Sequence, residues 1–188
     1  MTDGDALPRR NVELKALDPD PRRSFEVAKS LGAADRGVRF QRDTYFVVPR
    51  GRLKLREESP GSAVLVQYER PDDTGARESR YRIVDVPDPS ALAAALGAAL
   101  GVLVVVEKDR RLLLWENVRI HFDAVRGLGP HIEFEAVAPP GSDLEDEHRK
   151  IARLRSAFGI ADRDLVATSY SDRLLELGAA CAGRGGGK

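Results

Sequence analysis

Apolar and polar residues alternate strictly near the start of the chain, over residues 10–17. Val12 and Leu14 stand on one side of this alternation, and Glu13 and Lys15 stand on the other. A period of two residues is typical of a β-strand, because successive side chains of a strand point to opposite faces. The segment is therefore predicted to be a strand with one apolar face and one charged face.

A helical period follows the first strand. Phe25, Ala28 and Leu31 recur at helical spacing after a turn with two prolines, so a short helix is predicted over 23–31, ended by Gly32. Further helices are predicted over 91–100, with Ser90 as its cap, and over 144–158 and 171–177.

The remaining periodic segments are predicted strands joined by short turns. With the first strand they cover 10–17, 38–48, 52–57, 64–70, 77–86, 102–114, 116–125 and 131–138. The hairpin links are too short for crossover connections, so neighbouring strands must run antiparallel. The predicted fold is α+β, an eight-stranded antiparallel β-barrel with flanking helices, because closure removes the open edges of such long strands.

Length and composition indicate one soluble globular domain. The chain has 188 residues, of which 42% are hydrophobic and 32% charged, and neither a repeat nor an interdomain linker interrupts it. We predict a single domain over residues 10–177, a flexible N-terminus over 1–9 and a flexible Gly-rich tail over 178–188.

Charge and cysteine content indicate which binding partners and which cellular compartment to expect. Thirty Lys and Arg balance thirty Asp and Glu, so no overall field attracts nucleic acid or an acidic membrane surface. Cys181, the single cysteine, cannot form an intramolecular disulfide, which fits a reducing cytoplasm. Residues 1–10 lack the apolar run of a secretory signal, and the longest apolar stretch, 91–106, is too short to span a bilayer. A cytoplasmic protein without nucleic-acid or membrane partners is expected.

Charged side chains share one face of most predicted strands. This face collects Glu13, Lys15, Arg52, Lys54, Arg56, Arg80, Arg82, Lys108, Arg110, Arg119, His121, Asp123, His131, Glu133 and Glu135. For any one strand, a solvated face is an adequate explanation. The four predicted helices, however, also need an apolar surface, and the outside of a barrel provides one.

An apolar outer face places the charged face inside the barrel. Buried charges cost several kcal/mol each unless they are paired, hydrated or liganded. Arg and Lys suit phosphate oxygens, whereas carboxylates repel an anion unless a cation stands between them. Both kinds of group in one tunnel therefore indicate a phosphate-rich ligand together with a divalent metal.

Other common site motifs are missing from the sequence. His121, His131 and His148 lack the spacing of a zinc site. Gly127 and Gly129 lack the strand-to-helix context of a dinucleotide loop, and no P-loop sequence occurs. Ser169 and Ser171 have no plausible catalytic triad.

The segment Asn11-Val12-Glu13-Leu14-Lys15 resembles the Glu-x-Glu-x-Lys signature of the CYTH superfamily, also called triphosphate tunnel metalloenzymes. This superfamily includes class IV adenylate cyclases, thiamine triphosphatases and inorganic tripolyphosphatases. Further similar segments follow in the family's order, at 41–46, 51–56, 68–72, 106–110, 121–125, 127–129, 133–135 and 169–170. The resemblance covers about residues 10–176.

The resemblance implies a tunnel that binds a triphosphate and Mg²⁺ or Mn²⁺. It implies metal ligation by Glu13 and Glu133, with Glu135 and Asp123 as acidic groups near the metal and the reacting phosphate. The implied triphosphate cradle consists of Lys15, Lys54, Arg56, Lys108 and Arg110, with Arg80 as a weaker candidate; Lys15 and Asp123 are the candidate catalytic residues.

Two positions depart from the family pattern. Asn11 stands where the signature has its first Glu, so one metal-binding charge is missing. Glu69 and Arg70 occupy a stretch where related enzymes often place a Lys before Gly-Pro.

Two reactions fit a triphosphate bound beside a divalent metal. Attack of water on the terminal phosphorus makes a triphosphatase, and attack of the ribose 3′-hydroxyl on the α-phosphorus makes cyclic nucleotide and pyrophosphate. The segments 41–46 and 51–56 look more like the cyclase branch, so class IV adenylate cyclase-like chemistry on ATP is placed first. A binding protein that holds nucleotide or polyphosphate without turnover is the third alternative. The resemblance also implies a homodimer as a plausible assembly.

Overall fold

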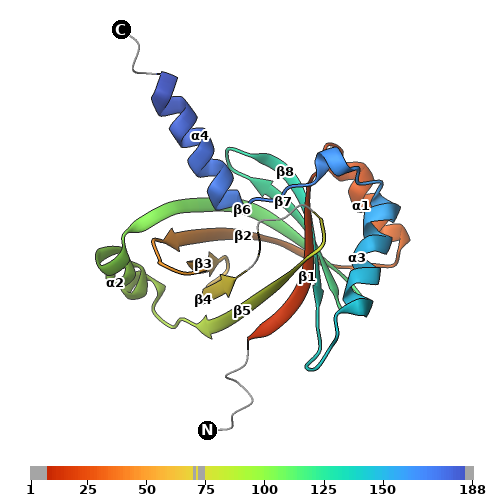
Figure 1. Ribbon diagram of the computed structural model, residues 1–188, viewed down its shortest axis with the longest axis horizontal. Helices are drawn as coiled ribbons and strands as arrows, with labels where there is room; N and C mark the ends of the chain where they lie inside the picture. The colour runs from red at the N-terminus through yellow and green to blue at the C-terminus, as the bar shows by residue number, and fades with distance from the viewer. Residues whose placement is uncertain (1–7, 70, 72–74, 185–188) are drawn as a thin grey trace.

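The computed structural model describes residues 8–69, 71 and 75–184, and these form a closed antiparallel barrel of eight strands (Figure 1). The strands are β1 (Arg9–Leu17), β2 (Ala34–Phe46), β3 (Arg52–Glu58), β4 (Ser62–Glu69), β5 (Arg77–Asp85), β6 (Val102–Trp115), β7 (Val118–Val125) and β8 (Gly129–Val137). Their order around the barrel is β1-β5-β4-β3-β2-β6-β7-β8. The predicted fold class is confirmed.

Four α-helices flank the barrel in the described part of the chain. They are α1 (Pro21–Ser30), α2 (Pro89–Leu100), α3 (Glu145–Phe158) and α4 (Tyr170–Arg184). Asp20 caps α1 by accepting a hydrogen bond from the Arg23 backbone N–H at 3.1 Å. Asp88 caps α2 in the same way, through the Ala91 N–H at 3.0 Å, so the prediction that Ser90 is this cap was wrong.

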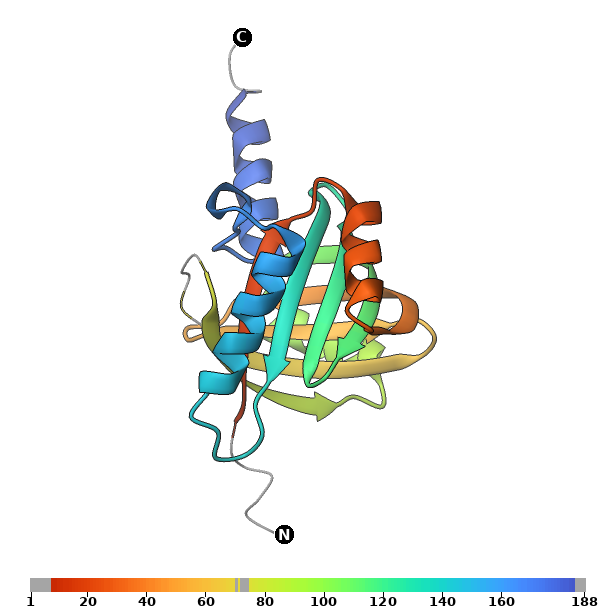
Figure 2. The same cartoon turned by 90° about the vertical axis from the view of Figure 1, so that its right-hand side faces the viewer.

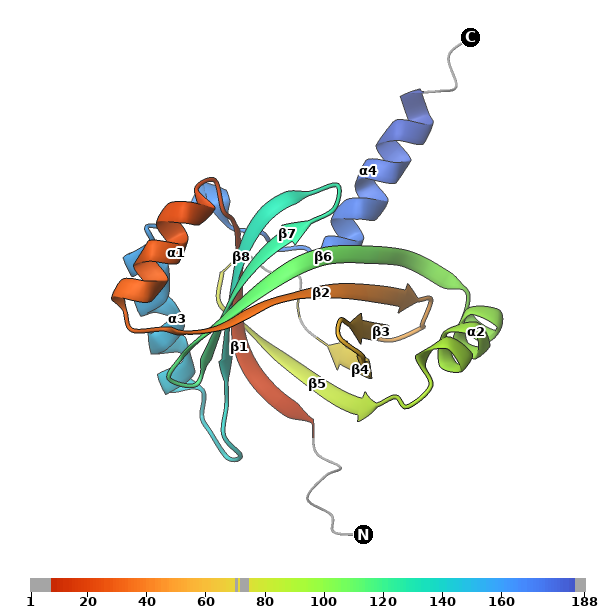
Figure 3. The ribbon, with the colours of Figure 1, turned by 180° about the vertical axis from the view of Figure 1, so that it is seen from behind.

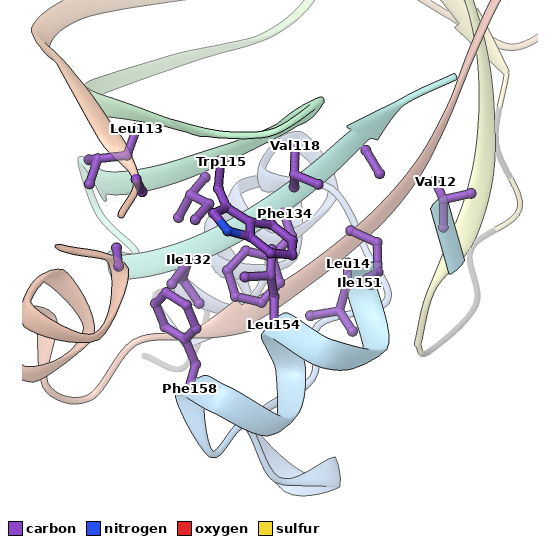
Figure 4. Close-up of a cluster of buried hydrophobic side chains, with 14 of the residues drawn as sticks. Val12, Leu14, Leu113, Trp115, Val118, Ile132, Phe134, Ile151, Leu154 and Phe158 are labelled. Carbon is purple, nitrogen blue, oxygen red and sulfur yellow. The ribbon is translucent and has the colours of Figure 1, made fainter. Parts of the chain in front are cut away.

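The main hydrophobic core lies outside the barrel, beneath α1 and α3 (Figure 4). Val12 and Leu14 of β1 pack there with Phe134 of β8 and with Ile151 and Leu154 of α3, and all five side chains are buried. Figure 2 shows α1 and α3 lying over the face that includes β7 and β8. Each such side chain stabilises the fold by roughly 1.5–3 kcal/mol. The apolar face of these strands therefore points outward, as the alternation predicted.

The C-terminal helix is longer than the sequence pattern predicted. α4 begins beside β6, projects away from the barrel and continues to Arg184, seven residues beyond the predicted end at Leu177 (Figure 3). Residues 178–184 are thus helical rather than a flexible tail, because the alanines at 179, 180 and 182 favour helix. Residues 1–7 and 185–188 lie outside the described residues, as does Arg70.

No helix in the described ranges combines the length and the apolar character needed to cross a membrane.

Candidate functional site

The barrel encloses a cavity of about 470 Å³ whose wall includes residues from all eight strands. The predicted site residues that line it are Glu13, Lys15, Lys54, Arg56, Lys108, Arg110, Glu133 and Glu135. They converge because residues separated by two along a strand share a face, and barrel closure turns that face inward. The predicted charged interior is therefore present on β1, β3, β6 and β8.

Three of the lining cations meet at one buried carboxylate, that of Asp43 on β2. Lys54 Nζ lies 2.9 Å and Lys108 Nζ 3.1 Å from Asp43 Oδ2. Arg56 donates from Nε and Nη2 to both carboxylate oxygens, at 2.7 and 2.8 Å. Burial favours a raised pKa for Asp43, but the surrounding Arg56, Lys108 and Lys54 hold its pKa well below the usual range. One carboxylate thus orients three cations toward the same part of the cavity.

The amine of Lys108 is deeply buried among charged side chains. Its side chain is 1% exposed. Burial lowers the pKa of Lys108 to about 7, with the neighbouring Arg56 and Arg110 acting in the same direction and Asp43 opposing them. A bound anion would favour the protonated form of this amine.

Arg110 on β6 is fixed by two carboxylates. It makes a bidentate contact to Asp123, with Nε–Oδ1 and Nη2–Oδ2 distances of 2.6 and 2.5 Å, and Nη2 also donates to Glu133 Oε2 at 2.8 Å. The Tyr170 hydroxyl donates to Asp123 Oδ2 at 2.8 Å. Burial opposes ionisation of Asp123, yet Arg110 lowers its pKa to about 2. The carboxylate of Asp123 is fully buried and stands behind Arg110, outside the cavity lining.

Lys15 lies near the beginning of α4. Its Nζ is 3.9 Å from the centre of the Tyr170 ring and 3.5 Å from Glu133 Oε1. The carboxylate of Glu133 therefore contacts Lys15 and Arg110 together. Burial alone would raise the pKa of Glu133, but Lys15, the neighbouring His121 and Arg110 hold it well below the usual range.

Two more of the acidic side chains expected at or near the metal lie directly opposite each other on neighbouring strands. Glu13 of β1 pairs in register with Glu135 of β8. Arg77 Nε donates to Glu13 Oε1 at 3.2 Å, and Asn11 Nδ2 donates to Glu135 Oε1 at 2.5 Å. Asn11, which stands where the family signature has its first Glu, therefore contacts Glu135, a candidate metal ligand.

The donor atoms of this region fit a hard divalent cation in their chemistry. Glu13, Glu133 and Glu135 supply carboxylate oxygens from adjoining strands. The buried Asn11 Oδ1 has no hydrogen-bond partner among the described residues, and an amide oxygen is an acceptable ligand for Mg²⁺ or Mn²⁺. No three acidic, His or Cys side chains of the described ranges already surround a single point. The carboxylates instead contact Arg77, Lys15, Arg110 and Asn11.

Arg80 does not belong to the site. It is 61% exposed and donates to Glu78 at 2.8 Å on the outer side of the barrel. The inner side chains of β5 are those of Arg77, Ser79 and Tyr81, which are buried. The register explains the error, because β5 pairs with β1 so that Arg77 lies opposite Glu13.

Several lining residues were not predicted as site residues. Asp43, Gln41 and Tyr45 share the inner face of β2, and Tyr68 on β4 and Tyr170 at the start of α4 join them. The alternation along β2 could have identified Asp43, because it lies two residues from both Gln41 and Tyr45 and therefore shares their face. His121, considered above for zinc, lines the cavity as well.

Comparison with known proteins identifies the family of this arrangement. The family model described as the CYTH domain matches residues 9–170. None of the curated protein sequences matches the chain significantly.

Solved structures share the fold at low sequence identity. The PH1012 protein from Pyrococcus horikoshii OT3 is 21% identical, with a TM-score of 0.78, over 86% of this chain and 98% of that chain. A "putative adenylate cyclase" from Vibrio parahaemolyticus is 18% identical, with a TM-score of 0.73, over 87% of this chain and 97% of that chain. The HpAC1 protein from Hippeastrum, described as having a dominant triphosphatase activity, is 14% identical, with a TM-score of 0.59, over 86% and 91%.

Proposed function

The chain belongs to the CYTH domain family, and from this premise we propose that it is a metal-dependent enzyme that acts on the triphosphate group of its substrate. The observation that carries the proposal is the convergence of Lys15, Lys54, Arg56, Lys108 and Arg110 on a cavity that Glu13, Glu133 and Glu135 also line. Five cations suit a polyanion, and the carboxylates suit the cation that would accompany it.

The cationic side chains have distinct tasks in the proposed mechanism. Lys54, Arg56 and Lys108, already gathered at Asp43, bind phosphate oxygens at one side of the cavity. Arg110 and Lys15 donate to oxygens at the other side, where Glu133 contacts both. Donors held in place before the substrate arrives stabilise the charge that develops on the reacting phosphate without having to reorganise.

Glu13, Glu133 and Glu135 would hold the divalent ion, with the amide oxygen of Asn11 as a further ligand. When bound, Mg²⁺ or Mn²⁺ neutralises phosphate charge and polarises the phosphorus–oxygen bonds. Asp123 acts indirectly in this scheme, because its carboxylate fixes the Arg110 guanidinium and does not reach the cavity. In this proposal it is a positioning residue, whereas the family resemblance implied an acidic group near the metal and the reacting phosphate.

For the reaction itself we place cyclisation of a nucleoside triphosphate, ATP in the first instance, ahead of hydrolysis. In cyclisation the ribose 3′ oxygen forms a bond to the α-phosphorus while the bond from that phosphorus to the α–β bridging oxygen breaks. Pyrophosphate leaves with the bridging oxygen, and the hydroxyl proton passes to water. This order rests on the cyclase-like segments 41–46 and 51–56. Terminal hydrolysis is the second candidate, favoured by the dominant triphosphatase activity described for the structurally similar Hippeastrum protein.

A product assay tests the proposal and separates the two reactions. The protein is incubated with ATP, GTP, thiamine triphosphate or tripolyphosphate in the presence of Mg²⁺ or Mn²⁺, and phosphate, pyrophosphate and cyclic nucleotide are measured. Cyclic nucleotide with stoichiometric pyrophosphate supports the cyclase. Orthophosphate from tripolyphosphate as the dominant product supports the triphosphatase, and binding without any product leaves a nucleotide- or polyphosphate-binding protein.

A matched pair of arginine variants checks that the cavity is responsible. Arg56→Met removes a lining cation, whereas Arg82→Met removes an exposed arginine on the outer face of β5. Loss of a charge-assisted hydrogen bond weakens binding by about 1.5–3 kcal/mol, so tripolyphosphate affinity should fall roughly tenfold to a hundredfold in Arg56→Met only. Equal affinities in the two variants would place the anion outside the barrel.

A further inference from the structure

One sector of the cavity wall carries no charge. Val64 and Val66 of β4 and Ile83 of β5 line the cavity between the charged faces of β3 and β1. Val66 lies directly opposite Ile83 in the β4–β5 register. Arg80 and Arg82, which the alternation of charges predicted on the inner face of β5, lie on its outer face, and Ile83 lines the cavity instead.

The apolar sector adjoins the cations that are proposed to hold phosphate. Val64 is the register partner of Arg56, and Val66 is the partner of Lys54. Neighbouring strands are about 4.8 Å apart, so Val64 and Val66 stand beside Arg56 and Lys54 on the inner face of the barrel. Tyr68 and Tyr81, also in register with each other, extend the wall beside them.

These apolar side chains remain accessible from inside the barrel. Val64 and Val66 are partly exposed, and Ile83 is 41% exposed although it lines the cavity. In contrast, the apolar side chains under α1 and α3 are almost completely buried. A ligand group that covers these exposed β-branched side chains would gain binding free energy, because apolar surface is removed from water. An inorganic phosphate chain has no surface that can provide this gain.

We propose that Val64, Val66 and Ile83 bind the organic group of an organic triphosphate, so that this protein prefers such esters over inorganic tripolyphosphate. The inference rests on the proposed function and deepens it by naming the substrate class and the residues that select it. The organic group lies against β4 and β5, with the aromatic rings of Tyr68 and Tyr81 beside it, while Lys54 and Arg56 hold the phosphates. A planar base or another ring with an apolar face matches this wall.

The test uses a substitution that changes polarity with little change of shape. In the double variant Val64→Thr/Val66→Thr, hydroxyl groups replace two lining methyl groups and both side chains remain β-branched. Val84→Thr is the matched control, because Val84 is 58% exposed and points outward from β5. Calorimetry measures the dissociation constants of ATP, GTP, thiamine triphosphate and tripolyphosphate in the presence of Mg²⁺.

The wild-type protein should bind at least one of the three organic triphosphates more tightly than tripolyphosphate. The double variant should bind that ester about tenfold more weakly, with tripolyphosphate changed less than twofold and the control unchanged throughout. The inference is overturned if no organic triphosphate is preferred, or if the double variant changes organic and inorganic ligands equally. Failure of the wild-type protein to bind any triphosphate would instead overturn the proposed function, and the inference with it.

Discussion

At the residue scale, the burial of Lys108 has a consequence for how an anion binds. Burial lowers the pKa of its amine to about 7, while Asp43 favours the charged form and Arg56 and Arg110 oppose it. A bound polyanion favours the charged amine and raises this pKa. Between about pH 7 and the raised value, binding should therefore draw a proton from solution. Below pH 7 Lys108 is already protonated, so the uptake should vanish.

Calorimetry at pH 8 in buffers of different ionisation enthalpy measures this proton uptake for tripolyphosphate. Lys108→Arg is the diagnostic variant, because arginine keeps its charge at this pH and has no proton to gain. The uptake should be close to one proton in the wild-type protein and near zero in the variant. The same uptake in both proteins would assign the proton to another group.

The sequence predicted most of the site residues but not all of them, and a comparison of β5 with β8 explains why. On β8 the charged residues occur on one parity only, so alternation sufficed to place Glu133 and Glu135 inside. On β5 charged residues occupy both parities, with Arg77 on one and Arg80 on the other. Only the register with β1, which sets Arg77 opposite Glu13, decides between them. Such pairing depends on barrel closure, which no local pattern contains.

At the element scale, the turn between β2 and β3 determines how Lys54 and Arg56 meet Asp43. Gly51 in this turn has a φ of +62°, and a Cβ there would lie 2.8 Å from the carbonyl oxygen of Tyr68. Gly51→Ala should therefore destabilise the fold by roughly 2–4 kcal/mol, combining the left-handed backbone cost with a clash against the backbone. Urea unfolding measures this change in the free energy of unfolding.

Gly37→Ala is the control for the turn prediction. Gly37 also has a positive φ, of +85°, but a Cβ there meets nothing within 4 Å. It should cost only the backbone term, about 1–2 kcal/mol. If the two variants lost the same stability, the close approach of Gly51 to Tyr68 would have no energetic weight.

Element boundaries show a further limit of sequence reasoning. The period identified every strand of the barrel, yet β2 begins at Ala34 rather than Val38, and α4 continues past Leu177. Near the start of β2, its register with β6 shifts between Asp35 and Val38. Such an irregularity breaks the alternation on which the prediction depended.

At the scale of the whole molecule, a chain of zero net charge concentrates cations in one cavity. The barrel achieves this by closing eight strands whose apolar faces pack outward and by placing carboxylates among the cations. Without a bound polyanion, Asp43 is the shared counter-ion of Lys54, Arg56 and Lys108. Binding of a polyanion in the cavity should therefore change the free energy of unfolding of the barrel.

Asp43→Asn tests this linkage. Removal of a buried partner charge should destabilise the fold by about 3–5 kcal/mol, because three cations then face one another without a carboxylate. Tripolyphosphate at a hundred times its dissociation constant stabilises any protein that binds it only when folded by about 2.7 kcal/mol. At equal ligand concentration, tripolyphosphate should stabilise the variant more than the wild type. The anion replaces the missing negative charge and no longer competes with Asp43 for the three cations. Thermal unfolding with and without tripolyphosphate measures both effects.

Asp35→Asn, which breaks the partly exposed pair with Arg111, should cost less than about 1 kcal/mol and leave the ligand response unchanged. Equal ligand-induced shifts in Asp43→Asn and the wild type would mean that the polyanion does not bind at the cations of Asp43.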